Sequence, residues 1–128
     1  MVDGGSHQRG DLCGLGLRRR AVPPVPLKSR PSSLVATDVL GCLSLPADVL
    51  AEASALPPLS VAEVLAFPNA GAYGLTASPV LFHGHPAPAE VAFAGGVIEQ
   101  IRARSPTRSI IEDQNLLRQI GTSAIKSE

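Results

Sequence analysis

Proline and glycine interrupt this chain so often that they limit every element it can form. Twelve prolines and twelve glycines occur among its 128 residues. Proline removes a backbone donor, and glycine is entropically costly within a helix or strand, so both residues favour turns over long helices. The sequence therefore predicts a mainly β fold of five to seven short strands with one C-terminal helix, and its length suits one domain.

Composition and charge argue against two classes of partner. Eleven basic and eleven acidic residues give zero net charge, which disfavours a nucleic-acid partner held through its phosphates. No apolar run approaches the roughly 20 residues that a membrane helix needs, and the first residues lack a signal-peptide pattern. The two cysteines, Cys13 and Cys42, are then expected to be reduced thiols in a cytoplasmic protein.

Apolar segments between the breakers predict the strands. A hairpin is indicated where residues 89–93 and 97–102 alternate on either side of Gly95 and Gly96. Further strands are expected at residues 22–28, 34–40, 60–67 and 79–82. The prolines of the first of these segments predict an edge strand or a strand start.

Two segments predict helices. Pro46 near a first turn favours a short helix over residues 46–53. Apolar residues at roughly helical spacing predict a longer helix that is opened by Ser105 and stopped by Gly121. The tail after Gly121 is expected to fray.

The only tyrosine of the chain lies between glycines, in the segment Gly71-Ala72-Tyr73-Gly74. Glycine permits positive φ and lets a backbone approach a ligand closely. Spacing alone leaves two interpretations open. The segment is either a tight turn whose tyrosine packs on neighbouring structure, or a loop that presents the phenol to a ligand.

A longer motif around Tyr73 resembles a known family. The motif comprises residues 68–74, PNAGAYG, followed by Ser78, Pro79, Phe82, His83, His85 and Pro86. It is similar to the closing motif of the fold-type III pyridoxal-phosphate (PLP) decarboxylases, which include diaminopimelate and ornithine decarboxylases. The branch that acts on carrier-protein-linked amino acids is the most similar. The resemblance runs from the Val-Asp-Gly-Gly segment at residues 2–5 to about Arg104.

The resemblance implies a fold and a domain organisation. It implies a β-barrel-like C-terminal domain of the alanine racemase/ornithine decarboxylase type over residues 1–104, with a poorly matched loop at 6–20. Residues 105–128 would then form a C-terminal helix and tail. Because Val-Asp-Gly-Gly is interior in the family, we expect the C-terminal part of a larger enzyme or a truncated copy of one. The implied partner is a PLP-binding barrel domain, in cis or in trans, within a homodimer.

The same resemblance assigns residues to the cofactor and to the chemistry. Tyr73, with Gly71 and Ala72, is expected at the phosphate of PLP. Residues 41–48, GCLSLPAD, resemble an active-site loop that reads Gly-Pro-Leu-Cys-Thr-Pro-x-Asp in the family. Aligned without gaps, the family's catalytic cysteine falls on Ser44.

Two further positions of this loop follow from that alignment. Cys42 falls on the family's proline and is the alternative catalytic residue if the loop shifts by two positions. Asp48 is predicted to contact the substrate.

Two departures from the family carry expectations of their own. Leu45 stands where diaminopimelate and ornithine decarboxylases have an acidic residue that grips a distal amine, which disfavours amine-terminated free substrates. The family has Gly-Asp in the turn before the strand at residues 60–67, and this chain has Ala62-Glu63. Because alanine does not adopt positive φ cheaply, that turn is expected to differ or to be strained.

The histidines and cysteines match no standard metal motif. The spacing of His83 and His85 relative to Cys13 and Cys42 fits no common zinc pattern, so no metal site is predicted. The two histidines are interpreted as loop residues near the cofactor mouth. His7 is similar to a position in a histidine-containing stretch of the family.

Two functions from different classes remain. The chain is either the C-terminal part of a PLP-dependent amino-acid decarboxylase or a non-catalytic remnant that keeps a dimerisation surface. The intact Tyr73 motif favours the first function. Ser44 in place of cysteine, and the absence of a lysine-bearing barrel from these 128 residues, favour the second for the chain taken alone.

Overall fold

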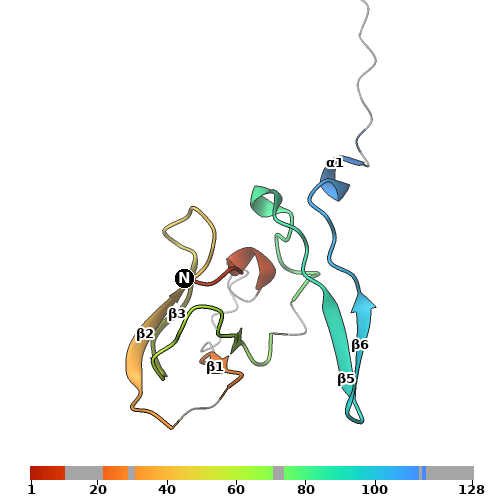
Figure 1. Cartoon of the computed structure of the whole chain (residues 1–128). Coiled ribbons are helices and arrows are strands. Elements are labelled where there is room, and N and C mark those ends of the chain that lie inside the picture. The colour runs from red at the N-terminus through yellow and green to blue at the C-terminus, as the bar shows by residue number, and fades with distance from the viewer. Residues whose placement is uncertain (11–21, 29–30, 71–73, 113, 115–128) are drawn as a thin grey trace, which may run out of the picture.

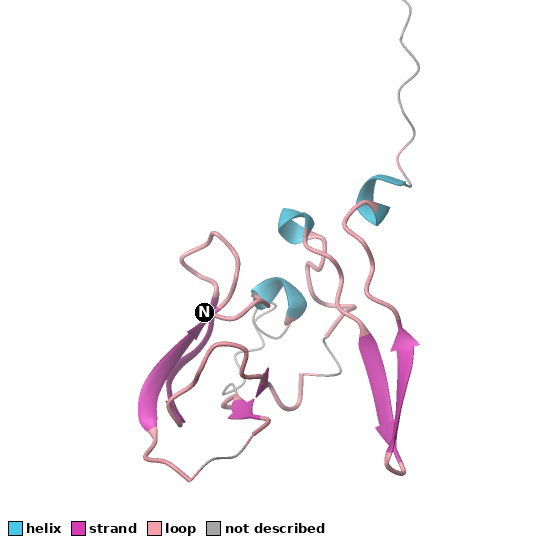
Figure 2. Ribbon diagram, viewed as in Figure 1, coloured by secondary structure: helices cyan, strands magenta, loops and turns pink. Residues whose placement is uncertain are grey.

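The computed structural model describes residues 1–10, 22–28, 31–70, 74–112 and 114, which are mainly strands and turns. Their strands pair antiparallel into three two-stranded sheets (Figures 1 and 2). The elements in chain order are η1 (Ser6–Gln8), β1 (Val25–Pro26), β2 (Val35–Leu40), β3 (Val49–Leu56), β4 (Leu65–Ala66), η3 (Phe82–Gly84), β5 (Glu90–Ala94), β6 (Val97–Arg102) and α1 (Ser109–Glu112). The mainly β prediction is confirmed. The sheets form no closed barrel within this part of the chain, so the barrel-like arrangement stays a prediction.

The β2–β3 sheet carries the core. Its β-branched residues favour extended backbone, as predicted for the segment that became β2. Three side chains form the buried cluster, and four partly buried ones pack against it: Val39, Leu50 and Leu56, then Val2, Ala51, Leu65 and Phe67. The register shifts between Thr37 and Val39, and Asp38 at this irregularity accepts the backbone N–H of Ala53 at 2.8 Å.

β3 replaces the short helix that was predicted over residues 46–53, and that prediction was wrong. Pro46 lies instead in a tight turn, where the Asp48 N–H donates to the Leu45 carbonyl at 3.0 Å. The strand that follows buries Leu50 and Leu56. Pairing with β2 and burial of these leucines outweigh the helix propensity of the alanines between them.

The strand predicted at residues 79–82 was also wrong. The Phe82 N–H donates to the Pro79 carbonyl at 2.9 Å, and the Gly84 N–H donates to the Leu81 carbonyl at 3.1 Å. These local bonds use donors that a strand would offer to a neighbour. The segment therefore forms turns and η3, with His83 in the left-handed region at φ 58°.

β1 and β4 are shorter than predicted, with two residues each. Prolines around β1 limit its pairing, as expected for an edge. In the turn before β4, Ala62 has φ 70°, which confirms the expected strain. The Ser60 N–H donates to the Glu63 carboxylate at 2.9 Å and holds this turn closed.

The β5–β6 hairpin is confirmed. Gly95 and Gly96 have φ of 57° and 79°, and Phe93 lies opposite Ile98. The hairpin lies to one side of the other two sheets (Figure 1). Five large apolar side chains of this hairpin are exposed: Val91, Phe93, Val97, Ile98 and Ile101.

One helical turn, α1, stands where the long C-terminal helix was predicted. Residues 113 and 115–128 lie outside the described residues, so the rest of that helix stays a prediction. Among the described residues, no helix has the length and apolar character needed to cross a membrane.

Candidate functional site

The N-terminal segment runs beside the end of β2 and places η1 over the loop at residues 41–48. The Val2 N–H donates to the Leu40 carbonyl at 2.9 Å, and the Cys42 N–H donates to the Gly4 carbonyl at 3.0 Å. Segments that are distant in sequence therefore meet at one place. The loop resembling the family's active-site loop and the Val-Asp-Gly-Gly segment are neighbours.

Asp48 links these two segments. Its side chain is 3% exposed, and its two oxygens accept different backbone N–H groups. Oδ1 accepts from Ser6 at 2.7 Å, and Oδ2 accepts from Leu43 at 2.8 Å. The Gly41 N–H also donates to the Asp48 carbonyl at 2.8 Å, which closes the loop at its ends. Asp48 therefore fixes the position of η1 relative to the loop.

Two glycines make room for this carboxylate. A Cβ atom on Gly41 would overlap the Asp48 carboxylate, and one on Gly5 would lie 2.9 Å from both Asp48 Oδ2 and His7 Nδ1. Gly5, just before η1, and Gly41, at the start of the loop, therefore have a steric reason to lack a side chain, because each lies against the Asp48 carboxylate.

The pKa of the Asp48 carboxyl lies below its ordinary value. Burial by itself would raise it, but the backbone N–H groups of Ser6 and Leu43 stabilise the charged form and outweigh that effect. The buried carboxylate is therefore negatively charged at neutral pH, between the backbone of Ser6 and that of Leu43.

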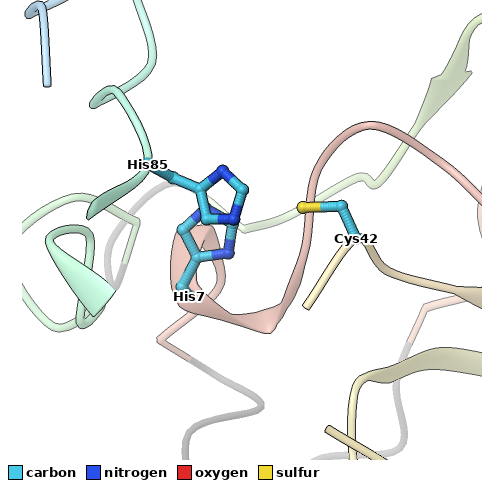
Figure 3. Close-up of side chains that lie close together, drawn as sticks. All are labelled: His7, Cys42 and His85. Carbon is cyan, nitrogen blue, oxygen red and sulfur yellow. The ribbon is translucent and has the colours of Figure 1, made fainter. Parts of the chain in front are cut away.

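Three side chains that could bind a metal ion lie close together near the Asp48 carboxylate. His7 from η1, Cys42 from the loop and His85 from the segment after η3 have ligand atoms within 4.8 Å of one another. Figure 3 shows the Cys42 sulfur directed toward the two imidazole rings, whose centroids lie 4.9 Å apart. Cys42 and His85 are half-buried.

His7 is the least exposed member of this cluster. Its side chain is 1% exposed, and neither ring nitrogen has a hydrogen-bond partner. The pKa of His7 is lowered, first by burial and then by the neighbouring His85, so the neutral ring is favoured at neutral pH.

The Cys42 thiol is not activated by its surroundings. Burial, followed by the charge of Asp48, raises its pKa above the ordinary value. The thiol is therefore protonated at neutral pH and a weak nucleophile.

The predicted site residues occupy different environments. Ser44 is exposed within the loop, Cys42 points to the histidines, and Asp48 is buried. Their catalytic and substrate roles stay predictions. Tyr73, Gly71 and Ala72 lie outside the described residues.

Sequence reasoning missed the cluster of His7, Cys42 and His85. Each comes from a different element, so no local spacing connects them. The available signals were the similarity of His7 to a histidine-containing stretch of the family, and the presence of Cys42 and His85 in two further segments that resemble it.

Comparison with known proteins relates the sequence of this chain to that of a decarboxylase. The chain is 33% identical over 119 residues to L-glutamyl-[BtrI acyl-carrier protein] decarboxylase of Niallia circulans, covering 89% of this chain and 28% of that protein. No protein-family model matches it.

Solved structures share its fold. A protein from Aquifex aeolicus is 26% identical with a TM-score of 0.78, over 87% of this chain and 27% of that one. Diaminopimelate decarboxylase from M. jannaschii is 21% identical with a TM-score of 0.78, over 91% of this chain and 26% of that one. The chain thus spans little more than a quarter of the length of each of these proteins.

Proposed function

We propose that this chain, which is related in sequence and fold to the C-terminal part of the fold-type III PLP-dependent decarboxylases, supplies the C-terminal domain of such an enzyme. The observation that carries the proposal is the similarity to a carrier-protein decarboxylase over 89% of the chain. Residues 1–104 would form the domain, and residues 105–128 would form a C-terminal helix and tail.

The chain would act together with a lysine-bearing barrel domain, in cis or in trans, within a homodimer. Its lysines are Lys28 and Lys126. Lys28 is exposed beside β1, and Lys126 lies outside the described residues. A lysine that forms a Schiff base is held in a buried pocket. The described part of the chain therefore offers no buried lysine to anchor PLP, and the anchor is assigned to the barrel.

PLP, when bound, supplies an electron sink for the electron pair left as carbon dioxide departs. The contribution of this chain would be to hold and orient. Tyr73, with the backbone at Gly71 and Ala72, would contact the cofactor phosphate. The loop at residues 41–48 would face the active site shared with the partner.

Ser44 is exposed in that loop, at the position where the resembled family has cysteine. The bonds that Asp48 accepts from Ser6 and Leu43 support a fixed loop in which Ser44 is exposed. A thiol has an ordinary pKa of about 8.5, whereas an aliphatic hydroxyl is a much weaker acid. Ser44 would therefore return a proton to the substrate carbon slowly.

The substrate class follows from Leu45. This side chain is 42% exposed at the position where related enzymes hold a distal amine with an acidic residue. An apolar residue there offers no ion pair to a distal ammonium group. We therefore propose an amino acid without such a group as the substrate, and the similarity to a carrier-protein decarboxylase supports its attachment to a carrier protein.

The alternative is a non-catalytic module that keeps the dimerisation surface. Ser44 in place of cysteine and the exposed apolar residues of the β5–β6 hairpin favour it. A domain of this kind would assemble with a barrel domain without adding chemistry.

A chimera separates the two functions. The corresponding C-terminal part of the Niallia circulans decarboxylase is replaced by this chain, and carbon dioxide release from its carrier-linked glutamyl substrate is measured. The decarboxylase proposal expects measurable release that falls in Tyr73→Phe together with the PLP affinity. A folded chimera that binds PLP and releases no carbon dioxide would support the alternative.

A further inference from the structure

We propose that His7, Cys42 and His85 form a binding site for one zinc-class divalent metal ion. The site uses only residues of this chain, so it stands independently of the decarboxylase proposal. Neither the sequence motifs nor the relationship to decarboxylases assigns it.

The geometry fits a small tetrahedral site. Two imidazoles and one thiolate are common zinc ligands, with bonds of about 2.0–2.3 Å and hence ligand atoms about 3.5 Å apart. In this structure the three ligand atoms lie within 4.8 Å of one another. A shift of roughly 1 Å closes that gap, and the half-buried Cys42 and His85 side chains can make it by rotation.

The unpartnered His7 ring is a second, independent reason to place a metal ion at this site. A buried polar group without a hydrogen bond is destabilising, because the hydrogen bonds it made to water are not replaced. Both ring nitrogens of His7 are in this state, although the side chain is 1% exposed. A metal ion bound at one nitrogen would use a lone pair that otherwise has no partner.

The electrostatic surroundings favour a cation. Asp48 Oδ2 and His7 Nδ1 both face the position that a Cβ atom of Gly5 would occupy, at 2.9 Å from each. The negative charge of the Asp48 carboxylate close to the site favours a bound cation.

The competing interpretation is a thiol–imidazole pair for nucleophilic chemistry. Such a pair needs a thiol whose pKa is lowered. Burial and Asp48 raise the pKa of Cys42 instead. A bound metal ion reverses this situation, because coordination deprotonates a thiol outright.

Ligand chemistry also sets the choice of metal. Thiolate and imidazole select zinc, or cobalt as its spectroscopic substitute, over the hard cations. Magnesium prefers oxygen ligands and an octahedral shell, so it should not compete. Within the described residues, this cluster supplies three protein ligands, which leaves one position for water or an external ligand.

The test is a titration of the full chain, stripped with chelator, with Co²⁺. We expect one equivalent to bind, with a thiolate charge-transfer band and the visible absorption of tetrahedral cobalt. Zn²⁺ should displace the ion, and Mg²⁺ should not. Cys42→Ser should abolish the charge-transfer band, and His85→Gln should weaken binding by about tenfold or more.

Two matched variants serve as controls. Cys13→Ser changes the other cysteine, and His83→Gln changes a histidine whose ring centroid lies 6.4 Å from that of His85. Both should bind cobalt as the unaltered chain does. Circular dichroism confirms that each variant is folded.

A second measurement avoids substitutions altogether. Zn²⁺ should protect Cys42, and not Cys13, from alkylation in the unaltered chain, as mapped by peptide mass spectrometry. Absence of one-to-one binding, an unchanged band in folded Cys42→Ser, or protection of Cys13 in place of Cys42 would each overturn the proposal.

Discussion

The carboxylate of Asp48 accepts the backbone N–H of Ser6 at 2.7 Å, although 42 positions separate the two residues in sequence. The other carboxylate oxygen holds Leu43 within the loop. This one side chain therefore sets how η1 meets the loop that carries Cys42 and Ser44. It supports both the proposed active-site loop and the proposed metal site.

Replacing Asp48 by asparagine should destabilise the chain by about 2 kcal/mol, because one buried N–H would then face an amide NH₂. Urea unfolding followed by circular dichroism measures the change. Asp38→Asn is the matched control, since Asp38 also accepts a backbone N–H at 2.8 Å but in an exposed position. The control should lose about 1 kcal/mol or less. Equal losses would contradict the linking role of Asp48.

Acid should weaken the fold through the same carboxyl. The pKa of the Asp48 carboxyl in the folded state lies below its unfolded value of about 3.9. The unfolded chain therefore takes up the proton first as the pH falls. The contribution of Asp48 is complete above that unfolded pKa and is lost as the pH falls through the folded one. With chelator present, the free energy of unfolding should drop more steeply below about pH 4 in the unaltered chain than in Asp48→Asn. Parallel curves would argue against this linkage.

Gly41→Ala should be destabilising by about 2 kcal/mol, because the new Cβ overlaps the Asp48 carboxylate. In an Asp48→Ala background the same change should have a much smaller effect, since the obstructing group is gone. Gly4→Ala is the control, because its Cβ would meet only the flexible end of Gln8, at 2.9 Å. Additive effects of Gly41→Ala and Asp48→Ala in urea unfolding would rule out the steric explanation.

Sequence reasoning predicted local features of the fold better than tertiary ones. The β5–β6 hairpin followed from glycines that adopt positive φ, and the strain at Ala62 followed from the loss of glycine there. β3 was mistaken for a helix because the burial of Leu50 and Leu56 against β2 is not visible in local propensity.

In the candidate site too, sequence reasoning found the local motifs and missed what distant segments assemble. A family motif pointed to Tyr73 and to the loop at residues 41–48. The cluster of His7, Cys42 and His85 could not be predicted, because three separate elements assemble it. The hydrogen bonds of Val2 with Leu40, of Cys42 with Gly4 and of Ser6 with Asp48 bring η1 and the loop together.

The β5–β6 hairpin should drive self-association of the isolated chain. Phe93 and Ile98 are 73% and 71% exposed and lie opposite each other, and the chain carries no net charge. Exposed apolar patches of this kind favour association. Multi-angle light scattering should show oligomers for the unaltered chain and a smaller average mass for Phe93→Ser/Ile98→Ser. Val61→Ser, at another exposed apolar residue, should leave the mass unchanged. If the unaltered chain is a monomer at high concentration, the hairpin is not a surface that a partner normally covers.

The central claim, that this chain supplies the active-site loop of a decarboxylase, is tested most directly in the chimera with the Niallia circulans enzyme. The measurement is the rate of carbon dioxide release by the parent chimera, by Ser44→Cys and by Cys42→Ser. We expect Ser44→Cys to raise the rate by about tenfold or more, because a thiol returns the proton far more readily than a hydroxyl. Cys42→Ser should have little effect. A chimera that stays inactive with Ser44→Cys, or one in which Cys42→Ser abolishes activity while Ser44→Cys changes nothing, would contradict the assignment of this loop.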